Sequence, residues 1–309
     1  MIRYYSLMGR AAYIFSVLFT ASVLTGHDIA AQTELKTAMT DSAGAVPGSS
    51  WASLYAGGGY GSNMIYLGST ISQDNPYGYA SLSFGFRDKL FASVSAVNLT
   101  SADPLAAFYI GSLTWSHPFN DWFDVSAGLY HYRVDPSLTD TLFASFTYGD
   151  VSLGFDWNIL YTKISAGAVF SEESQGFYQI RNSRYFETPD FFRGKANISF
   201  DPYINLMFGN FTEITTTANT INYYSVPSPY RKWRNNGNNT PSGGTVNTDY
   251  SYSDRFGLLE IDFGLPVDFN TDFMTIGLEP SYVIPIYDDT YYPGAKGFVL
   301  SASVIFRIF

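Results

Sequence analysis

The chain of 309 residues has no cysteine, only 3 histidines and few charged side chains. Without cysteine it can form neither a disulfide bond nor a thiolate metal site. Charged residues make up 14% of the chain, whereas soluble domains contain roughly a quarter. The net charge of -10 argues against nucleic acid as a partner, because contacts to phosphate need clustered lysine and arginine.

The chain is instead rich in aromatic residues and glycine, with 25 Tyr, 26 Phe and 27 Gly. So many aromatic residues exclude a disordered chain. Apart from a stretch near the N-terminus, no apolar run approaches the roughly 20 residues that a membrane-spanning helix needs. A composition this apolar, without such a helix, indicates β-strands in a membrane rather than a secreted enzyme.

The N-terminal residues have the three parts of a secretory signal peptide. Arg3 and Arg10 precede the apolar run Ala11–Leu24, and the small residues Ala30 and Ala31 follow it. We therefore expect a signal peptide over residues 1–31 and a short periplasmic lead-in over 32–50. The barrel domain then spans 51–309. The alternative, an N-terminal membrane anchor, is disfavoured because the apolar run is too short.

Alternation of apolar and polar residues dominates the rest of the chain. Trp122–Tyr130, Val151–Asn158 and Lys195–Asp201 each place apolar residues on one face and polar or small residues on the other. This is the period of a β-strand with two different faces. Aromatic residues gather near the segment ends, as in transmembrane barrels. Since lipid does not tolerate open strand edges, we expect an all-β, antiparallel, up-and-down transmembrane β-barrel.

The lengths of the links between segments allow the strands to be counted. In outer-membrane barrels, short periplasmic turns alternate with longer outer loops. This alternation predicts twelve strands if Trp51–Ser72 and Val151–Ser171 are each one long strand, the second with a β-bulge near Ile159–Thr162. The alternative is fourteen strands, with extra hairpins at Gly61–Asn63 and near Tyr161. Either even number leaves both chain ends in the periplasm.

The expected short turns are Arg87–Lys89, His117–Asp121, Gly149–Asp150, Asp201–Pro202 and Pro266–Asp272. The expected outer loops are Gln73–Pro76, Ser101–Pro104, Asp135–Asp140, Glu172–Asp190, Ala218–Asp249 and Asp288–Ala295. The twelve expected strands span residues 51–72, 77–87, 89–99, 105–117, 121–133, 140–148, 151–171, 191–201, 203–217, 250–265, 271–287 and 296–309.

The last segment, Gly297–Phe309, resembles the terminal strand of Gram-negative outer-membrane proteins, which end in Phe after alternating apolar residues. Phe309 and Ile305 match that pattern, and Arg307 departs from it. The resemblance implies location in the outer membrane, contact with lipid and lipopolysaccharide, and recognition of this strand by the barrel-assembly machinery. It identifies no specific porin or transporter family.

In each expected strand, the alternate residues that carry polar side chains are predicted to face the lumen. An interior of one charge sign selects counter-ions, so acidic residues at these positions would favour cations if the lumen is open. The alternative is a lumen that paired charges plug. The expected lumen residues are Asp124, Asp156, Lys195, Asp201, Glu260, Asp262 and Glu279.

Two outer loops combine aromatic residues with arginine, a mixture that suits sugars, lipopolysaccharide or a protein partner. The alternative is an ordinary variable surface loop. The candidate binding residues are Arg181 and Arg184 in one loop and Arg231, Lys232, Trp233 and Arg234 in the other.

Evidence for an enzyme or a cofactor is weak. His131 with Asp135 or Asp140 could form a catalytic pair, but no nucleophile motif accompanies it. Asp288–Asp289 and Glu172–Glu173 lack the spacing of a calcium loop, and the glycines from Gly57 lack the Lys-Ser/Thr of a phosphate loop. The sequence therefore predicts neither an enzyme nor a resident metal or cofactor.

Three functions remain, in decreasing order of support. The first is a passive, porin-like channel for small hydrophilic solutes with a preference for cations. The second is a non-conducting barrel that serves as an accessory subunit or a surface-binding protein, with a protein partner or a second copy of the chain. The third is an outer-membrane hydrolase that uses His131.

Overall fold

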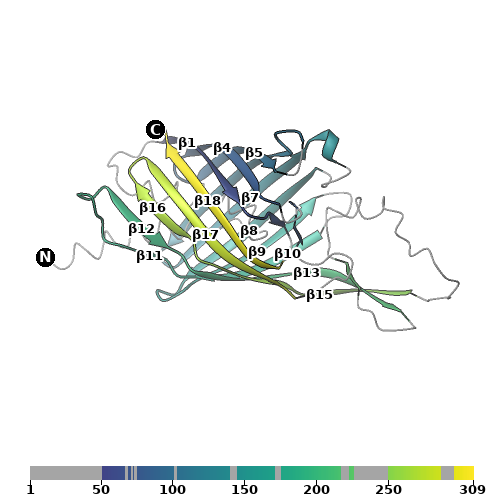
Figure 1. Ribbon diagram of the computed structural model, residues 1–309. Helices are drawn as coiled ribbons and strands as arrows, with labels where there is room; N and C mark the ends of the chain where they lie inside the picture. Colours follow the sequence, from purple (N-terminus) through teal and green to yellow (C-terminus); the bar gives the residue numbers. More distant parts are fainter. Residues whose placement is uncertain are drawn as a thin grey trace.

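The computed structural model of the chain describes residues 51–66, 69–70, 72, 75–100, 103–139, 145–170, 175–216, 223–225, 250–286 and 296–309. These residues form a closed antiparallel barrel (Figure 1). The twelve barrel strands are β1 (Ala52–Gly61), β4 (Tyr77–Phe86), β5 (Leu90–Leu99), β6 (Phe108–Asn120), β7 (Phe123–Val134), β8 (Phe146–Asp156), β9 (Tyr161–Phe170), β10 (Gln175–Ser183), β13 (Tyr203–Thr216), β15 (Tyr250–Gly264), β17 (Met274–Pro285) and β18 (Gly297–Arg307).

Each barrel strand pairs with the next one along the chain, and the last strand closes the ring against the first. β18 pairs with β17 on one side and with β1 on the other, where Tyr55 lies opposite Arg307. Beyond the last strand pair, the amide of Ile308 donates to the carbonyl of Leu54, and the amide of Leu54 donates to the carbonyl of Phe309. The expected up-and-down barrel of twelve strands is thus confirmed.

The two ends of the barrel differ. We call the end that holds the turns 87–89 and 121–122 and the C-terminus the turn end, and the opposite end the loop end. β13 and β15 run on beyond the loop end as a long hairpin (Figure 1), and β14 (Tyr223–Ser225) pairs with β13 there. Most of the expected loop Ala218–Asp249 and all of Asp288–Ala295 lie outside the described residues.

Several expected strand boundaries were wrong, although the count was right. Gly149 and Asp150 lie in the middle of β8, and the turn follows at Trp157–Leu160. There the amide of Asn158 donates to the Asp156 carboxylate, and Asn158 adopts a left-handed conformation, which Asn tolerates. The expected bulge near Ile159–Thr162 is therefore a turn, and the segment Val151–Ser171 is divided between two strands.

The sequence predicts a loop at Glu172–Asp190, but this stretch contains the barrel strand β10. The expected strand 191–201 instead contributes β12 (Ala196–Phe200), which is not one of the barrel strands. Similarly, β1 ends at Gly61 rather than Ser72. It is followed by a small hairpin of β2 (Ile65–Tyr66) and β3 (Ser69–Thr70).

Three short strands form an extension of the sheet at the turn end. β11 (Phe186–Glu187) pairs with β12, β12 pairs with β16 (Val267–Thr271), and β16 pairs with the first half of β17. This extension projects past the barrel on the side of the C-terminus (Figure 1). Breaks at Asp201–Pro202 and Leu265–Pro266 separate it from β13 and β15, because proline has no amide hydrogen to continue the ladder.

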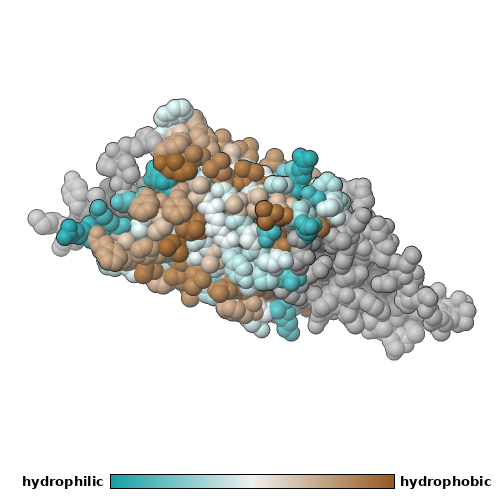
Figure 2. Space-filling view, turned by 45° about the horizontal axis from the view of Figure 1, so that its top comes forward, coloured by the Kyte–Doolittle hydropathy of each residue, from teal (hydrophilic) through white to brown (hydrophobic). Residues whose placement is uncertain are grey.

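The outer face of the barrel is apolar. Figure 2 shows hydrophobic side chains over much of the visible wall. Exposed outward residues near the strand centres are aliphatic, and rings from Trp115 to Trp157 contact one another in series around the turn end. An apolar band with an aromatic girdle is the surface of a transmembrane barrel. The aliphatic residues include Leu82, Val94, Leu113, Leu129, Val151, Ile164, Ile276 and Leu278.

Among the residues that the structure describes, no helix is both long enough and apolar enough to cross a membrane. In this described part of the chain, the single helical element is the 3₁₀ turn η2 (Pro136–Leu138), which follows β7.

Candidate functional site

The inner wall divides into two halves of different chemistry. The loop-end half holds a contiguous cluster of buried apolar and aromatic side chains contributed by nine barrel strands. Each of these side chains is buried. The cluster consists of Met64, Tyr77, Val97, Leu99, Ala107, Phe108, Ile110, Tyr130, Tyr132, Val134, Phe146, Tyr148, Val169, Phe177, Met207 and Leu259.

The segment that follows β1 folds inward and adds to this cluster. Met64 belongs to the apolar cluster, and Ile65 packs against Val283 on β17 and Val299 on β18, the two strands nearest to β1 on that side of the ring. The Ser72 hydroxyl accepts a hydrogen bond from the amide of Met64 and donates to the Asn63 side chain. Hydrogen bonds thus tie the two ends of this segment together, and its described residues Met64, Ile65 and Ser72 are buried inside the loop end.

The turn-end half is polar and predominantly acidic. The structure places five of the seven expected lumen residues inward and buried on barrel strands, namely Asp124 on β7, Asp156 on β8, Glu260 and Asp262 on β15, and Glu279 on β17.

One polar group lies where β7, β8 and β9 approach the turn end. The Tyr161 hydroxyl donates to the Asp124 carboxylate at 3.0 Å across the intervening strand β8. A side chain at Gly154 on that strand would collide with both groups. The absence of a side chain at Gly154 therefore allows this hydrogen bond to pass over β8 on the inner side of the barrel.

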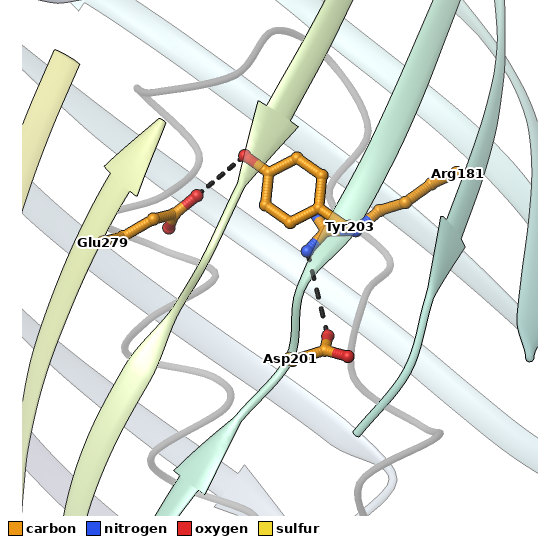
Figure 3. Close-up of polar contacts among 4 residues, drawn as sticks. All are labelled: Arg181, Asp201, Tyr203 and Glu279. Atoms are coloured by element: carbon orange, nitrogen blue, oxygen red, sulfur yellow. Dashed lines mark hydrogen bonds and ion pairs between the residues drawn. The ribbon is translucent and has the colours of Figure 1, made fainter. Parts of the chain in front are cut away.

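A second group lies on β10, β13 and β17, with the link before β13 (Figure 3). The Arg181 guanidinium stacks over the Tyr203 ring at 3.6 Å and forms an ion pair with Asp201 at 3.9 Å. The Tyr203 hydroxyl donates to the Glu279 carboxylate at 2.8 Å. Tyr203 thus contacts the Arg181 guanidinium with the face of its ring and the Glu279 carboxylate with its hydroxyl.

Asp262 joins this group through β13, where the Asn205 side-chain amide donates to its carboxylate at 3.1 Å. Glu260 lies two residues away on the same face of β15. It is 1% exposed, and neither of its carboxylate oxygens makes a hydrogen bond. This is an unusual state for a buried charged group.

Four expected site residues lie elsewhere. Lys195 is exposed in the turn between β11 and β12, because residues 192–195 form that turn rather than a strand. Asp201 lies in the link between β12 and β13 and pairs with Arg181. Arg181 itself faces the lumen on β10 and is not in an outer loop. Arg184 lies at the turn end, where its guanidinium donates to the Asn158 carbonyl. Arg231, Lys232, Trp233 and Arg234 lie outside the described residues.

Sequence reasoning missed Asp150, Lys163 and Gln179, which are all buried and inward. Asp150 was assigned to a turn, and Gln179 to a loop. Lys163 lay in the long expected strand beyond the assumed bulge. Counting alternate residues back from Val169 near the end of β9 would have given Lys163 the same face as Gly167 and Ser165.

Neither of the two described histidines, His117 and His131, faces the lumen. His131 is exposed on the outer face of β7, and its Nδ1 lies 3.0 Å from the Thr147 hydroxyl. Asp135 caps η2 instead of orienting His131, and hydrogen bonds from the Ser137 hydroxyl and amide lower the pKa of its carboxyl. His117 lies among the aromatic rings at the turn end, with Nδ1 at 3.2 Å from the Lys89 ammonium. Asp140 is not among the described residues.

Within the described ranges, no group of three or more His, Asp or Glu side chains is arranged to hold a metal ion.

The chain matches no known protein family and no curated protein sequence. Its fold is similar to solved outer-membrane barrels. A NanC porin structure matches over 82% of this chain and 98% of its own, with 10% identity and a TM-score of 0.40. LpxR from Salmonella typhimurium covers 82% and 99%, with 7% identity and a TM-score of 0.42. An outer membrane channel from Pseudomonas putida covers 85% and 100%, with 9% identity and a TM-score of 0.40. Similarities of this size carry no information about solutes or partners.

Proposed function

We propose that the protein is an outer-membrane channel that passes small hydrophilic solutes and prefers cations, with both chain ends in the periplasm. The observation that carries the proposal is the charge of the inner wall. On the described barrel strands, six buried acidic side chains face inward, whereas Lys163 is the one buried basic side chain and Arg181 and Arg307 are partly buried. The acidic residues are Asp124, Asp150, Asp156, Glu260, Asp262 and Glu279.

The state of these acids supports a conduction path rather than a structural plug. A plug built from charges would pair them, because an unpaired buried charge costs several kcal/mol. Both Glu260 oxygens and one Asp262 oxygen make no hydrogen bond. Buried polar groups without a partner cost free energy, and they are typical of places where a passing solute or ion supplies the partner.

The loop-end half sets the limits of this channel. Its apolar cluster occupies space inside the barrel, so we expect a large solute to pass only if the cluster and the hairpin after β1 move. Residues such as Tyr132 and Phe146, whose rings stack at 4.5 Å, would then restrict the size of the solute. We expect low conductance with closures rather than a wide, permanently open pore.

The same cluster favours a second function, a non-conducting barrel that binds a partner. A barrel whose loop-end half stays filled passes nothing, and its outer loops are then the functional surface. The two functions differ in electrical activity, which makes them separable.

The test is single-channel recording of the refolded protein in a planar bilayer under a salt gradient. We expect a reversal potential of cation-selective sign that moves toward zero in Glu260→Gln and Asp262→Asn. The matched control is Asp272→Asn, because Asp272 is exposed in the turn after β16 and its charge lies off the path. Anion selectivity, or silence from protein shown to be folded, would overturn the proposal.

A further inference from the structure

The strand register aligns four polar side chains in one row across the inner wall. Lys163 on β9 lies opposite Arg181 on β10, Arg181 opposite Asn205 on β13, and Asn205 opposite Asp262 on β15. Bases therefore occupy one side of the row and an acid the other, with an amide between them.

The next row toward the loop end again has a hydrogen-bond donor on β10 and an acid on β15, with different residues between and beside them. Ser165 lies opposite Gln179, Gln179 opposite Met207, and Met207 opposite Glu260. All four side chains are buried, and Met207 is 0% exposed. A hydrogen-bond donor on β10 thus again faces an acid on β15 across one strand.

These two rows concentrate the unsatisfied polar atoms of the barrel interior. Of the thirteen buried side-chain atoms without a hydrogen-bond partner among the described residues, seven lie here. Buried groups of this kind are rare in native proteins, and each one calls for a water, an ion or a ligand. The seven atoms are Ser165 Oγ, Gln179 Nε2, Arg181 Nε, Asn205 Oδ1, Glu260 Oε1, Glu260 Oε2 and Asp262 Oδ1.

The unsatisfied atoms are sorted by chemistry. On β10 they are donors, Gln179 Nε2 and Arg181 Nε, and on β15 they are carboxylate oxygens of Glu260 and Asp262. A bare metal ion would satisfy only the oxygens, since it offers the two donors no acceptor. A simple anion would satisfy only the donors. Separate waters can satisfy either side, and one solute satisfies both sides together if it has an anionic acceptor at one end and a cationic donor at the other.

We propose that this part of the wall binds a small zwitterionic solute with a primary ammonium and a carboxylate, as in a dipeptide. Its carboxylate contacts Arg181 and Gln179, and its ammonium contacts Glu260 and Asp262. Adjacent strands are about 4.8 Å apart, so the two sides, with β13 between them, suit charges separated by several bonds. The inference rests on the proposed channel, since it names the class of solute that the channel takes.

The surroundings prepare Arg181 for this contact. Stacking on Tyr203 and the long ion pair with Asp201 fix the plane of the guanidinium while Nε remains unpaired (Figure 3). Asn205 is held by its bond to Asp262, and its carbonyl oxygen is left without a partner. Preformed partners of this kind reduce the entropy cost of binding.

The test compares three related compounds by calorimetric titration of the refolded protein in detergent. Glycylglycine carries both charges, glycinamide only the cation and N-acetylglycinate only the anion. We expect glycylglycine to bind at least about tenfold more tightly than either analogue, because each lacks one set of charge-assisted hydrogen bonds. Equal affinity of glycinamide and glycylglycine would overturn the inference in favour of a cation site, and binding of none would overturn it outright.

Two variants assign the ends of the solute. Arg181→Gln is expected to lower the affinity for glycylglycine and N-acetylglycinate but not for glycinamide, and Glu260→Gln is expected to lower it for glycylglycine and glycinamide but not for N-acetylglycinate. The exposed Asp272→Asn serves as the control. Loss of affinity for all three compounds in either variant would contradict the assignment. The titration needs no ion flux, so failure to bind zwitterions in a protein that still conducts cations would overturn this inference and leave the channel standing.

Discussion

At the scale of single residues, the interior depends on glycines that lie beside aromatic rings on the neighbouring strand. A side chain at Gly167 would collide with Tyr148, and one at Gly264 would collide with Tyr203. The rings therefore lie flat against the wall, in space that a side chain would otherwise occupy. The glycine-rich composition has a structural purpose here, which is to let large rings fit into a narrow barrel.

Gly154→Ala tests this role. The added methyl group would overlap the Tyr161 hydroxyl and the Asp124 carboxylate, so the hydrogen bond between them must break or the strands must shift. Overpacking of this kind costs about 1–3 kcal/mol. We expect that loss in the free energy of unfolding, measured by urea titration in phospholipid vesicles with tryptophan fluorescence.

The matched control is Gly111→Ala on the outer face of β6, where no atom lies within 4 Å of the added methyl group. That variant should change stability by less than about 0.5 kcal/mol. Equal effects of the two substitutions would show that backbone freedom, and not the contact with Tyr161, accounts for the glycine at position 154.

The sequence predicts which side chains face the lumen only where the expected strand boundaries are close to the observed ones. Glu260, Asp262 and Glu279 lie in strands whose expected bounds were close to those observed, and the structure places them inward. Arg181 lies in β10, where the sequence predicts a loop, and Lys195 lies in a turn, where the sequence predicts a strand, so alternation could not be applied to either residue correctly. Pairing between distant strands, which creates the rows across the wall, has no signal in a single sequence.

At the scale of elements, the expected count of twelve was right because two errors compensated. One expected strand, 191–201, is outside the barrel, and one barrel strand, β10, was hidden in an expected loop. The turn near Trp157 joins two barrel strands, whereas the link near Pro202 joins β12 to β13. Their compositions are too similar for the sequence alone to show which one joins two barrel strands. Long regular strands such as β4, β5 and β17 were expected to within a few residues.

In the extension of β11, β12 and β16, one buried asparagine adds side-chain hydrogen bonds to the backbone pairing of the strands. The Asn270 side-chain amide donates to the Asn197 and Ser199 side chains, and its carbonyl oxygen accepts from the Thr275 hydroxyl. Asn270→Ala leaves these partners unsatisfied, which costs about 1–3 kcal/mol. We expect faster hydrogen exchange of the amides in β12 and β16, measured by mass spectrometry, with exchange in β4 and β5 unchanged.

Asn210→Ala provides the comparison, because Asn210 is exposed on the outer face of β13. Its removal should leave exchange in the extension as it is. If Asn270→Ala accelerated exchange throughout the barrel, the extension would be part of one cooperative unit with the ring, and its separate stabilisation by Asn270 would be refuted.

At the scale of the whole molecule, the barrel has an aliphatic outer face, a polar turn-end half inside and an apolar loop-end half inside. In a membrane the outer face lies in lipid, which makes the cost of an outward charge depend on its depth. Leu82 lies outward at the middle of β4 and Leu90 outward at the turn-end start of β5, and they are 46% and 37% exposed. The two positions differ in depth far more than in exposure.

Leu82→Arg should therefore lower the free energy of unfolding in vesicles by about 2–4 kcal/mol, whereas Leu90→Arg should lower it by at most about 1 kcal/mol. The difference arises because a guanidinium near the bilayer centre has no water to reach, while one at the strand end extends its side chain to the interface. Urea titration in vesicles measures both values. Equal costs at the two positions would place the membrane differently along the strands, and no cost at either would mean that this surface is covered by protein and not by lipid.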